Sequence, residues 1–274
     1  MAYISGTSGS DNLTGTNEAD ILEGLEGDDI LEGLDGNDRI FSGAGDDIIR
    51  DGSGDDIVYA GAGDDMIFNQ GGTDEFYGGV GSDTLITDVT GLPPSFTVLF
   101  DASTGEHGRV EASSFPNDII AGIENFTLIG DWNSNVIGDD GANILKTSDG
   151  EDTLSGLGGD DWLESGAGDD SIDGGAGNDV IIAGQGDDVV TGGDGEDIFA
   201  YFAGDDNIVV SDFEIGTDRL AFVNLGENFA VEDIVPFVSQ DGDDVLIAAG
   251  DQSIRLLDVN LLDMSADDVL LVQV

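Results

Sequence analysis

Apolar and polar residues recur along most of this chain with a period of nine positions. The register holds from Gly6 to Ile86 through nine consecutive nonapeptides, and it resumes from Gly138 to Val209 for eight more. When each copy is numbered from one to nine starting at Gly6, position eight is apolar in all 17 copies. With 39% apolar residues in the chain, chance agreement would be on the order of 10⁻⁷, so the repeat is real.

Each nonapeptide predicts one turn and one short strand. A period of nine is too long for a helical turn and too short for a helix-turn-helix unit. A glycine-rich hexad followed by an x-apolar-x triplet is instead typical of a tight turn that leads into a strand. Position four is glycine in every copy but the second, where Glu18 stands. Because only position eight is regularly apolar, we expect a thin core formed by that position alone.

The repeats divide the chain into four regions. We predict a first array over 1–86, a non-repeat β insert over 87–137, a second array over 138–209 and a C-terminal β cap over 210–274. In the insert, Phe96, Val98 and Phe100 follow a period of two, which predicts a half-buried strand. In the cap, the segments SDFEIGTDRLAF and DDVLIAAGDQSIRLLDV predict a hairpin or meander, which closes with SADDVLLVQV.

The charge balance excludes several classes of partner. The chain has 60 acidic and six basic residues, for a formal net charge of -54. It therefore has no basic surface for nucleic acid or anionic lipid. The regular apolar pattern is not that of a disordered acidic tract, and the lack of cysteine excludes disulfide and thiolate chemistry. No apolar run is long enough to span a membrane, and the N-terminal residues do not have the pattern of a cleavable signal peptide.

Position six carries the candidate chemistry, because it is aspartate in every copy except the one with Asn143. Two interpretations are open: these acids face water on an ordinary solenoid, or each copy forms half of a metal site. The candidate metal ligands are Asp11, Asp20, Asp29, Asp38, Asp47, Asp56, Asp65, Asp74, Asp83, Asp152, Asp161, Asp170, Asp179, Asp188, Asp197 and Asp206.

Two copies, GGAGNDVII (174–182) and GGDGEDIFA (192–200), nearly match the pattern G-G-x-G-x-D-x-U-x. The chain thus resembles the RTX (repeats-in-toxin, haemolysin-type) calcium-binding family. The resemblance implies an all-β fold, with a parallel β-roll in each array and two copies per coil. It also implies Ca²⁺ between turns of successive coils, held by the position-six aspartates and by backbone carbonyls of the glycine turns. Asn143 and Glu18 depart from this pattern.

Electrostatics favours the metal interpretation for such a stack. Strands in a sheet lie about 4.8 Å apart, so aspartates of neighbouring coils repel by roughly 3–4 kcal/mol at an effective dielectric constant of about 20. A protein whose free energy of unfolding is about 5–15 kcal/mol cannot remain folded against several such repulsions. A divalent ion between two aspartates turns the repulsion between their coils into attraction. Oxygen ligands in flexible loops suit calcium better than zinc or magnesium. We therefore expect a chain that is unfolded without calcium and folded at roughly 0.1–1 mM.

Position nine carries apolar residues on the outer faces. Phe41, Tyr59 and Tyr77 are spaced by 18 and share one face, whereas Phe68 and Ile86 share the opposite face. These residues either pack across strands or under the chain's own insert, or they form a surface for self-association or for stacking on glycans.

No pattern in the sequence indicates catalysis. The single histidine, His107, rules out an H-E-x-x-H zinc site, and no serine lies in a G-x-S-x-G elbow. A loop histidine without companions favours a structural role. Carboxylate pairs can hydrolyse glycosides, but calcium would hold these ones ionised. We therefore expect no enzyme activity and no cofactor other than calcium.

The segments outside the arrays extend the resemblance. IAGIENFTLIGDWNSNVIGDDGAN is similar to the segment that often precedes an RTX array, and 210–274 is similar to the C-terminal region of secreted RTX proteins. The latter similarity implies an uncleaved signal for type I secretion and a location outside the cell or at its surface. The alternative is a plain end cap of the solenoid.

Three functions remain open. The one we favour is a secreted structural protein of the cell surface or extracellular matrix, which folds on binding calcium and self-assembles into filaments or sheets. The second is a calcium-dependent module for polysaccharide binding or adhesion, and the third is a detached part of an RTX enzyme. We expect neither a nucleic-acid partner nor membrane insertion.

Overall fold

The computed structural model describes residues 1–88, 98–101, 108–112, 115–131, 133–202, 204–223, 234–249 and 252–272. The chain forms two compact units, residues 1–139 and 140–274, and the division into four regions stays a prediction. Among the described residues, no helix has the length and apolar character needed to cross a membrane. His107 and Phe96 lie outside the described residues, as do the side chains of Val98 and Phe100.

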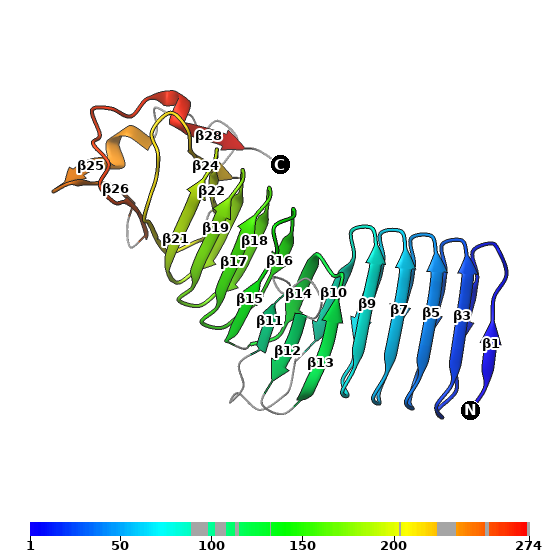
Figure 1. Cartoon of the computed structure of the whole chain (residues 1–274). Helices are drawn as coiled ribbons and strands as arrows, with labels where there is room; N and C mark the ends of the chain where they lie inside the picture. Colours follow the sequence, from blue (N-terminus) through cyan, green and yellow to red (C-terminus); the bar gives the residue numbers. More distant parts are fainter. Residues whose placement is uncertain are drawn as a thin grey trace. The chain divides into compact units, whose positions relative to one another are not determined.

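The first unit is a parallel β-solenoid built from two sheets. The chain alternates between the sheets, so that each strand pairs with the strand two places along the sequence. Leu22, Ile40, Val58 and Phe76 are register partners in succession, each 18 residues from the last. One sheet, seen in Figure 1 as a row of blue to cyan strands, contains β1 (Tyr3–Ser5), β3 (Ile21–Glu26), β5 (Arg39–Ala44), β7 (Ile57–Ala62) and β9 (Glu75–Val80). The other contains β2 (Asn12–Thr14), β4 (Ile30–Glu32), β6 (Ile48–Arg50), β8 (Met66–Asn69) and β10 (Thr84–Asp88).

Strands of the predicted insert continue these two sheets. β13 (Phe115–Ala121) pairs in parallel with β9, and β14 (Asn125–Ile129) pairs in parallel with β10. β12 (Gly108–Ala112) turns back antiparallel to β13. The strand predicted around Val98 is present as β11 (Val98–Asp101), which pairs with β15 (Ser134–Ile137).

The second unit repeats this architecture and adds a meander. One sheet contains β16 (Ile144–Lys146), β18 (Trp162–Ala167), β20 (Val180–Gln185), β22 (Ile198–Phe202), β24 (Arg219–Val223) and β28 (Val269–Val272). The other contains β17 (Thr153–Gly158), β19 (Ser171–Ala176), β21 (Asp187–Asp194), β23 (Asn207–Val210), β27 (Gln252–Leu256), β26 (Asp244–Ala249) and β25 (Val238–Asp241).

The predicted meander is confirmed for DDVLIAAGDQSIRLLDV, because β25, β26 and β27 pair antiparallel in sequence order. It is wrong for SDFEIGTDRLAF, which contains most of β24, because β24 pairs in parallel with β22. The closing segment differs, since β28 pairs in parallel with β24 and so extends a solenoid sheet. Two 3₁₀-helices, η1 (Val235–Phe237) and η2 (Ala266–Asp268), lie in this region, and Ser265 and Asp268 form a capping box at η2.

The core confirms the main prediction and corrects one detail. Position eight is buried in all copies, from Leu13 to Ile208, as the period requires. The expectation that only this position points inward is wrong. Position-six aspartates are also buried, and so are position-one residues such as Ser42 and Ala60. They lie where each turn reverses the chain between the sheets, so both turn-flanking positions face the neighbouring coil rather than solvent.

The turns impose a left-handed backbone at two positions. Position four is glycine with φ of +133° at Gly45 and +134° at Gly63, and a Cβ atom on either glycine would overlap the backbone of the preceding coil. Position two adopts positive φ even where it is leucine, with values of 89° at Leu25 and 72° at Leu157. Leucine is strained there, which glycine in other copies avoids.

Candidate metal centre

The position-six aspartates form a hydrogen-bonded row, which we call the inner ladder. The backbone N–H of Asp29 donates to Oδ1 of Asp47 at 2.7 Å, and the N–H of Asp47 donates to Oδ1 of Asp65 at 2.8 Å. On the opposite edge, the N–H of Asp38 donates to Oδ1 of Asp56 at 2.7 Å. One carboxylate oxygen of each aspartate therefore closes the turn of the preceding coil, 18 residues earlier.

The other carboxylate oxygen of the inner ladder is the atom available to a ligand. Within the described residues, Oδ2 is buried and makes no hydrogen bond in Asp29, Asp38, Asp47, Asp56, Asp65, Asp83, Asp170, Asp179, Asp188 and Asp197. A buried carboxylate oxygen left without a partner is costly, because water no longer solvates its charge. A row of such atoms is the arrangement expected where cations bind.

Backbone carbonyls face the same space. A Cβ atom built on Gly6, at position one, would lie 2.7 Å from Oδ2 of Asp11 and 2.7 Å from the carbonyl oxygen of Gly24 in the next coil. The same two kinds of oxygen crowd Gly24 and Gly174. Carboxylate and carbonyl oxygens thus converge beside a glycine that leaves room for an ion. These hard donors fit Ca²⁺, which takes several oxygen ligands in flexible geometry.

Burial and neighbouring like charges raise the pKa of several inner-ladder acids. Burial, helped by the carboxylate of a neighbouring coil, raises the pKa of Asp56 and Asp83 to about 7 against the lowering effect of a backbone hydrogen bond. In the second array, burial raises the pKa of Asp170 to about 7 and that of Asp188 to about 6. Bound calcium would supply the positive charge that stabilises the ionised forms at neutral pH.

All but two of the predicted ligands are buried in these rows. Asp11, in the first coil, is half-buried, and Asp206, in the last repeat, is exposed. In that last copy the neighbouring Asp205 is the buried acid, and its carboxylate accepts a hydrogen bond from the N–H of Phe202 at 2.6 Å. The inward position has therefore shifted by one residue.

Two acids outside the arrays close the inner ladder and were missed in the sequence. The N–H of Asp83 donates to Oε2 of Glu124 at 2.8 Å, and the N–H of Asp197 donates to Oδ1 of Asp218 at 3.1 Å. Each acid is followed two residues later by a fully or almost fully buried apolar residue, Phe126 or Leu220. The order acid, any residue, apolar residue therefore continues past the repeats, and it is the signal that could have found both.

A second row was also missed, and we call it the outer ladder. It is formed by position five, where the N–H of Asp46 donates to Oδ1 of Asp28 at 3.1 Å and the N–H of Asp64 donates to Oδ1 of Asp46 at 2.9 Å. These bonds run from a later coil to an earlier one, in the opposite sense to the inner ladder. The side chains are exposed, so the paired acids of each copy have different tasks.

Two solved structures are similar to this chain. Among curated proteins, none matches the chain. The solved structure of the extracellular lipase LipA from Serratia marcescens is 20% identical with a TM-score of 0.31, and the match covers 98% of this chain and 39% of the lipase. The AlgE6R3 subunit of the mannuronan C5-epimerase from Azotobacter vinelandii is 24% identical with a TM-score of 0.30, and the match covers 51% of this chain and 78% of the subunit. This chain thus spans well under half the length of the lipase.

A sequence profile gives the family. The profile of the RTX calcium-binding nonapeptide repeat (4 copies) matches residues 5–40, 32–67, 41–74, 52–85, 137–172, 164–199 and 173–208. Together these stretches cover more than half of the chain, and they coincide with the coils that carry the inner ladder. The chain therefore belongs to the RTX haemolysin-type family, as a calcium-binding repeat protein with the β-roll fold.

Proposed function

We propose that this protein is a secreted structural component of the cell surface or extracellular matrix, which folds where calcium is abundant. The observation that carries the proposal is the inner ladder, whose buried Oδ2 atoms, such as those of Asp47 and Asp65, have no hydrogen-bond partner among the described residues. Extracellular calcium modules work at about 10⁻⁴–10⁻³ M. A scaffold with this much interior charge would stay unfolded at low calcium and become rigid outside the cell.

A stack of aromatic rings supports self-association of the folded scaffold. The ring centroids of Phe41 and Tyr59 are 5.2 Å apart, those of Tyr59 and Tyr77 are 4.7 Å apart, and the rings are nearly parallel. Phe41 is 37% exposed and Tyr59 is 40% exposed. Rings fixed in a row on the outer face offer a preorganised apolar surface to a second copy.

Electron microscopy and light scattering of the secreted protein, with and without millimolar calcium, test this role. We expect filaments or sheets with calcium and unfolded monomers without it. Tyr59→Ala combined with Tyr77→Ala should abolish assembly while leaving calcium-induced folding intact. Phe68→Ala, on the opposite sheet, is the control. A calcium-loaded chain that stays monomeric at high concentration would contradict the structural role.

The same aromatic stack favours polysaccharide binding as the second candidate. The exposed edges of these stacked rings can contact the apolar faces of sugar rings, and calcium can bridge an acidic glycan to an acidic protein. Glycan binding by a calcium-loaded monomer, lost in the double tyrosine variant and kept in Phe68→Ala, would select this function. Turnover of a substrate would instead indicate an enzyme, which we do not expect.

We propose further that the C-terminal region directs type I secretion. The described residues there form a meander and two parallel strands that extend the solenoid, so the region can be removed without cutting through the arrays. Deletion of 215–274 should block export from a host with the secretion machinery. Unimpaired export would leave this region as an end cap only.

A further inference from the structure

Asp51 breaks the repeat in a way that the calcium-binding pattern does not explain. It occupies position one of the sixth copy, where the other copies have glycine, serine, alanine, threonine, asparagine or tyrosine. Among all 17 copies it is the one acid at that position. The chain therefore places a carboxylate there once, in the middle of the first array.

Position one directs its side chain at the inner ladder. A Cβ atom on Gly33, the residue one coil before Asp51, would lie 2.6 Å from Oδ2 of Asp38 in its own copy. Ser42, at position one of the preceding copy, acts on the position-six carboxyl of Asp47 and is among the groups that lower its pKa against the dominant effect of burial. A side chain at Asp51 is therefore built to meet Asp56, five residues later.

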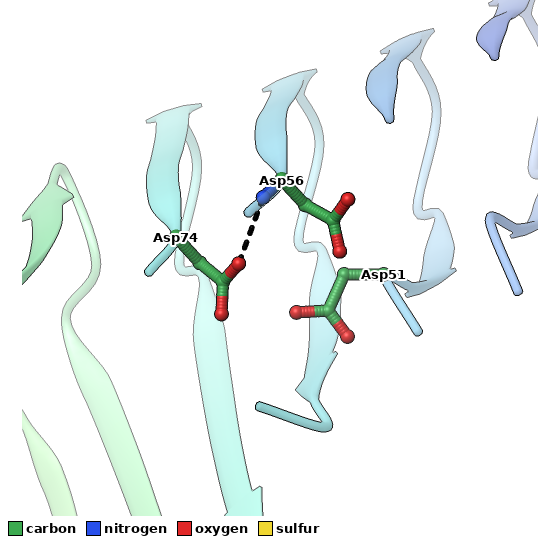
Figure 2. A group of neighbouring side chains, drawn as sticks. All are labelled: Asp51, Asp56 and Asp74. Carbon is green, nitrogen blue, oxygen red and sulfur yellow. Dashed lines mark hydrogen bonds between the residues drawn. The ribbon is translucent and has the colours of Figure 1, made fainter. Parts of the chain in front are cut away.

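The structure brings three buried carboxylates together at this place (Figure 2). Asp51 is 0% exposed, Asp56 and Asp74 are each 1% exposed, and one carboxylate oxygen from each lies within 4.8 Å of the other two. Within the described part of the chain, this is the one group of three metal-ligating side chains that meets that distance.

Backbone groups fix the orientation of the three acids. Oδ1 of Asp51 accepts hydrogen bonds from the N–H groups of Gly52 at 2.6 Å and Gln70 at 3.1 Å. Oδ1 of Asp74 accepts from the N–H of Asp56 at 2.8 Å. Oδ2 of Asp51 and Oδ2 of Asp56 are buried and make no hydrogen bond among the described residues. An unpartnered oxygen on a fully buried side chain, aimed at two further carboxylates, points to a bound cation.

The nearest basic residue in the sequence does not neutralise this cluster. Arg50 directs its guanidinium to the outer face, where it lies 3.8 Å from Glu32 and 4.9 Å from the ring centre of Phe68. Three like charges at this separation repel strongly in a buried site. A hydrophobic or serine side chain would fit position one without that repulsion, so the acid needs a ligand of opposite charge.

We propose that Asp51, Asp56 and Asp74 hold one Ca²⁺ in a site with one more carboxylate than the other rungs, and that this site fills first in the first array. Calcium affinity rises with the number of charged ligands, and an occupied interface brings two coils into register for their neighbours. The inference rests on calcium binding by the repeats and is independent of the protein's role outside the cell. Magnesium fits less well, because it keeps its waters and demands octahedral geometry.

The test compares Asp51→Asn with Asp55→Asn in the full chain. Both changes remove one carboxylate from the same copy. Asp55 belongs to the outer ladder, where Oδ1 accepts from the N–H of Thr73 at 3.1 Å, and asparagine serves in the same way at Asn37 and Asn178. Amide hydrogen exchange, read by mass spectrometry over a calcium series, reports each array separately.

We expect Asp51→Asn to raise the calcium concentration for half-maximal protection of the first array by about tenfold or more, while the second array is unchanged. Asp55→Asn should leave both midpoints close to those of the parent chain. At saturating calcium, Asp51→Asn should exchange no faster than the parent, because the site is then filled in both chains. A purely structural role for Asp51 instead predicts faster exchange of the first array at saturating calcium as well.

A gain-of-charge variant keeps the proposal testable if Asp51→Asn does not fold. Ser165 holds position one in the second array, beside Asp170 and one coil before Asp188. Ser165→Asp should lower the calcium midpoint of the second array severalfold. Unchanged midpoints in both variants would overturn the three-carboxylate site. If calcium protected neither array in any variant, calcium-driven folding would fail instead.

Discussion

The two arrays share one coil design but differ in interior charge. The first has an aspartate at position six of every copy and a further buried acid at Asp51. The second begins with the neutral Asn143 and has Ser165 at a position equivalent to that of Asp51. Near that neutral start, Lys146 pairs with Glu164 at 2.8 Å on the outer face, a half-exposed ion pair that contributes little. The first array therefore contains more charge that a cation must offset.

This difference shows which features of the coil are adjustable. Asn143 still donates its backbone N–H to Oδ1 of Asp161 at 2.7 Å, so a neutral residue keeps the hydrogen-bonded row. The row also ends in the same way in both units, with a carboxylate from outside the array, Glu124 or Asp218. The backbone scaffold thus tolerates changes of charge at the buried positions. The number of buried carboxylates determines how much calcium is needed to offset their repulsion.

Removal of calcium should have the largest effect. In excess chelator we expect both arrays to unfold, because the buried carboxylates then face one another without a counter-charge. Circular dichroism should show loss of β-structure, and hydrogen exchange should show loss of protection in both arrays. Full β content in chelator would contradict the metal-dependent fold. Magnesium at the same concentration serves as the control and should restore little.

Acidification of the calcium-free chain should restore part of the fold. Folding raises the pKa of Asp56 and Asp83 to about 7, from an ordinary value of 3.8. The folded state therefore binds protons more tightly than the unfolded state, and its stability is present below about pH 4 and is lost as the pH rises to about 7. We expect β content to increase as calcium-free protein is taken from pH 8 to pH 4.

The second array should respond in the same window, because burial raises the pKa of Asp170 to about 7. Added salt at pH 8 is the control. Salt screens exposed charges but acts weakly on buried ones, so it should not reproduce the effect of acid. An unchanged or falling β signal on acidification would indicate that repulsion in the inner ladder does not limit folding.

Core truncation should cost the same in either array. Leu31 and Leu163 occupy position eight and are both 0% exposed. Replacing either by alanine removes buried volume in a thin core, and each should lower the free energy of unfolding by about 2–5 kcal/mol. Denaturant unfolding at saturating calcium measures both. A clearly smaller loss for one variant would show that the arrays also differ in packing.

Relief of backbone strain should give the smallest effect, and in the opposite direction. Leu25 and Leu157 have positive φ and are partly exposed. Leu25→Gly or Leu157→Gly should raise the free energy of unfolding by about 0.5 kcal/mol. This is the net effect of the backbone strain that is relieved in the folded state and the larger conformational entropy of glycine in the unfolded chain, which opposes it. Glu23→Gly, within β3, is the control and should destabilise. Denaturant midpoints at saturating calcium report all three variants.

The period of nine was sufficient to predict the turns, the strands and the buried row from Leu13 to Ile208, whereas their parallel pairing was implied by the resemblance to RTX repeats. The prediction succeeded because every copy repeats a glycine-rich turn followed by an apolar position eight, so that a deviation in one copy, such as Glu18, does not obscure the pattern. The inward direction of positions one and six could not be predicted in this way. Hydrophobicity marks the core only where side chains are apolar, and here aspartate and serine occupy interior sites.

The closing acids were missed for a different reason. Glu124 lies 41 residues after Asp83, and Asp218 lies 21 residues after Asp197, so neither keeps the spacing of 18 that links coils within the arrays. The closing acids are thus placed by tertiary pairing with strands from outside the arrays. Asp205 differs, because it is buried in place of Asp206 and its carboxylate accepts a local hydrogen bond from the N–H of Phe202.

The opposite senses of the two ladders have a consequence for how such genes can change length. Within the arrays, a coil receives N–H groups from the coil before it on the inner ladder and, where position five is acidic, from the coil after it on the outer ladder, at a separation of 18 residues. Duplication or deletion of a whole coil leaves both sets of bonds in phase. An insertion of a single nonapeptide would transfer every downstream turn to the opposite edge, and in the first array it would set the six-residue strands against strands of three or four residues. Evolution of this scaffold is therefore expected to proceed in steps of two repeats.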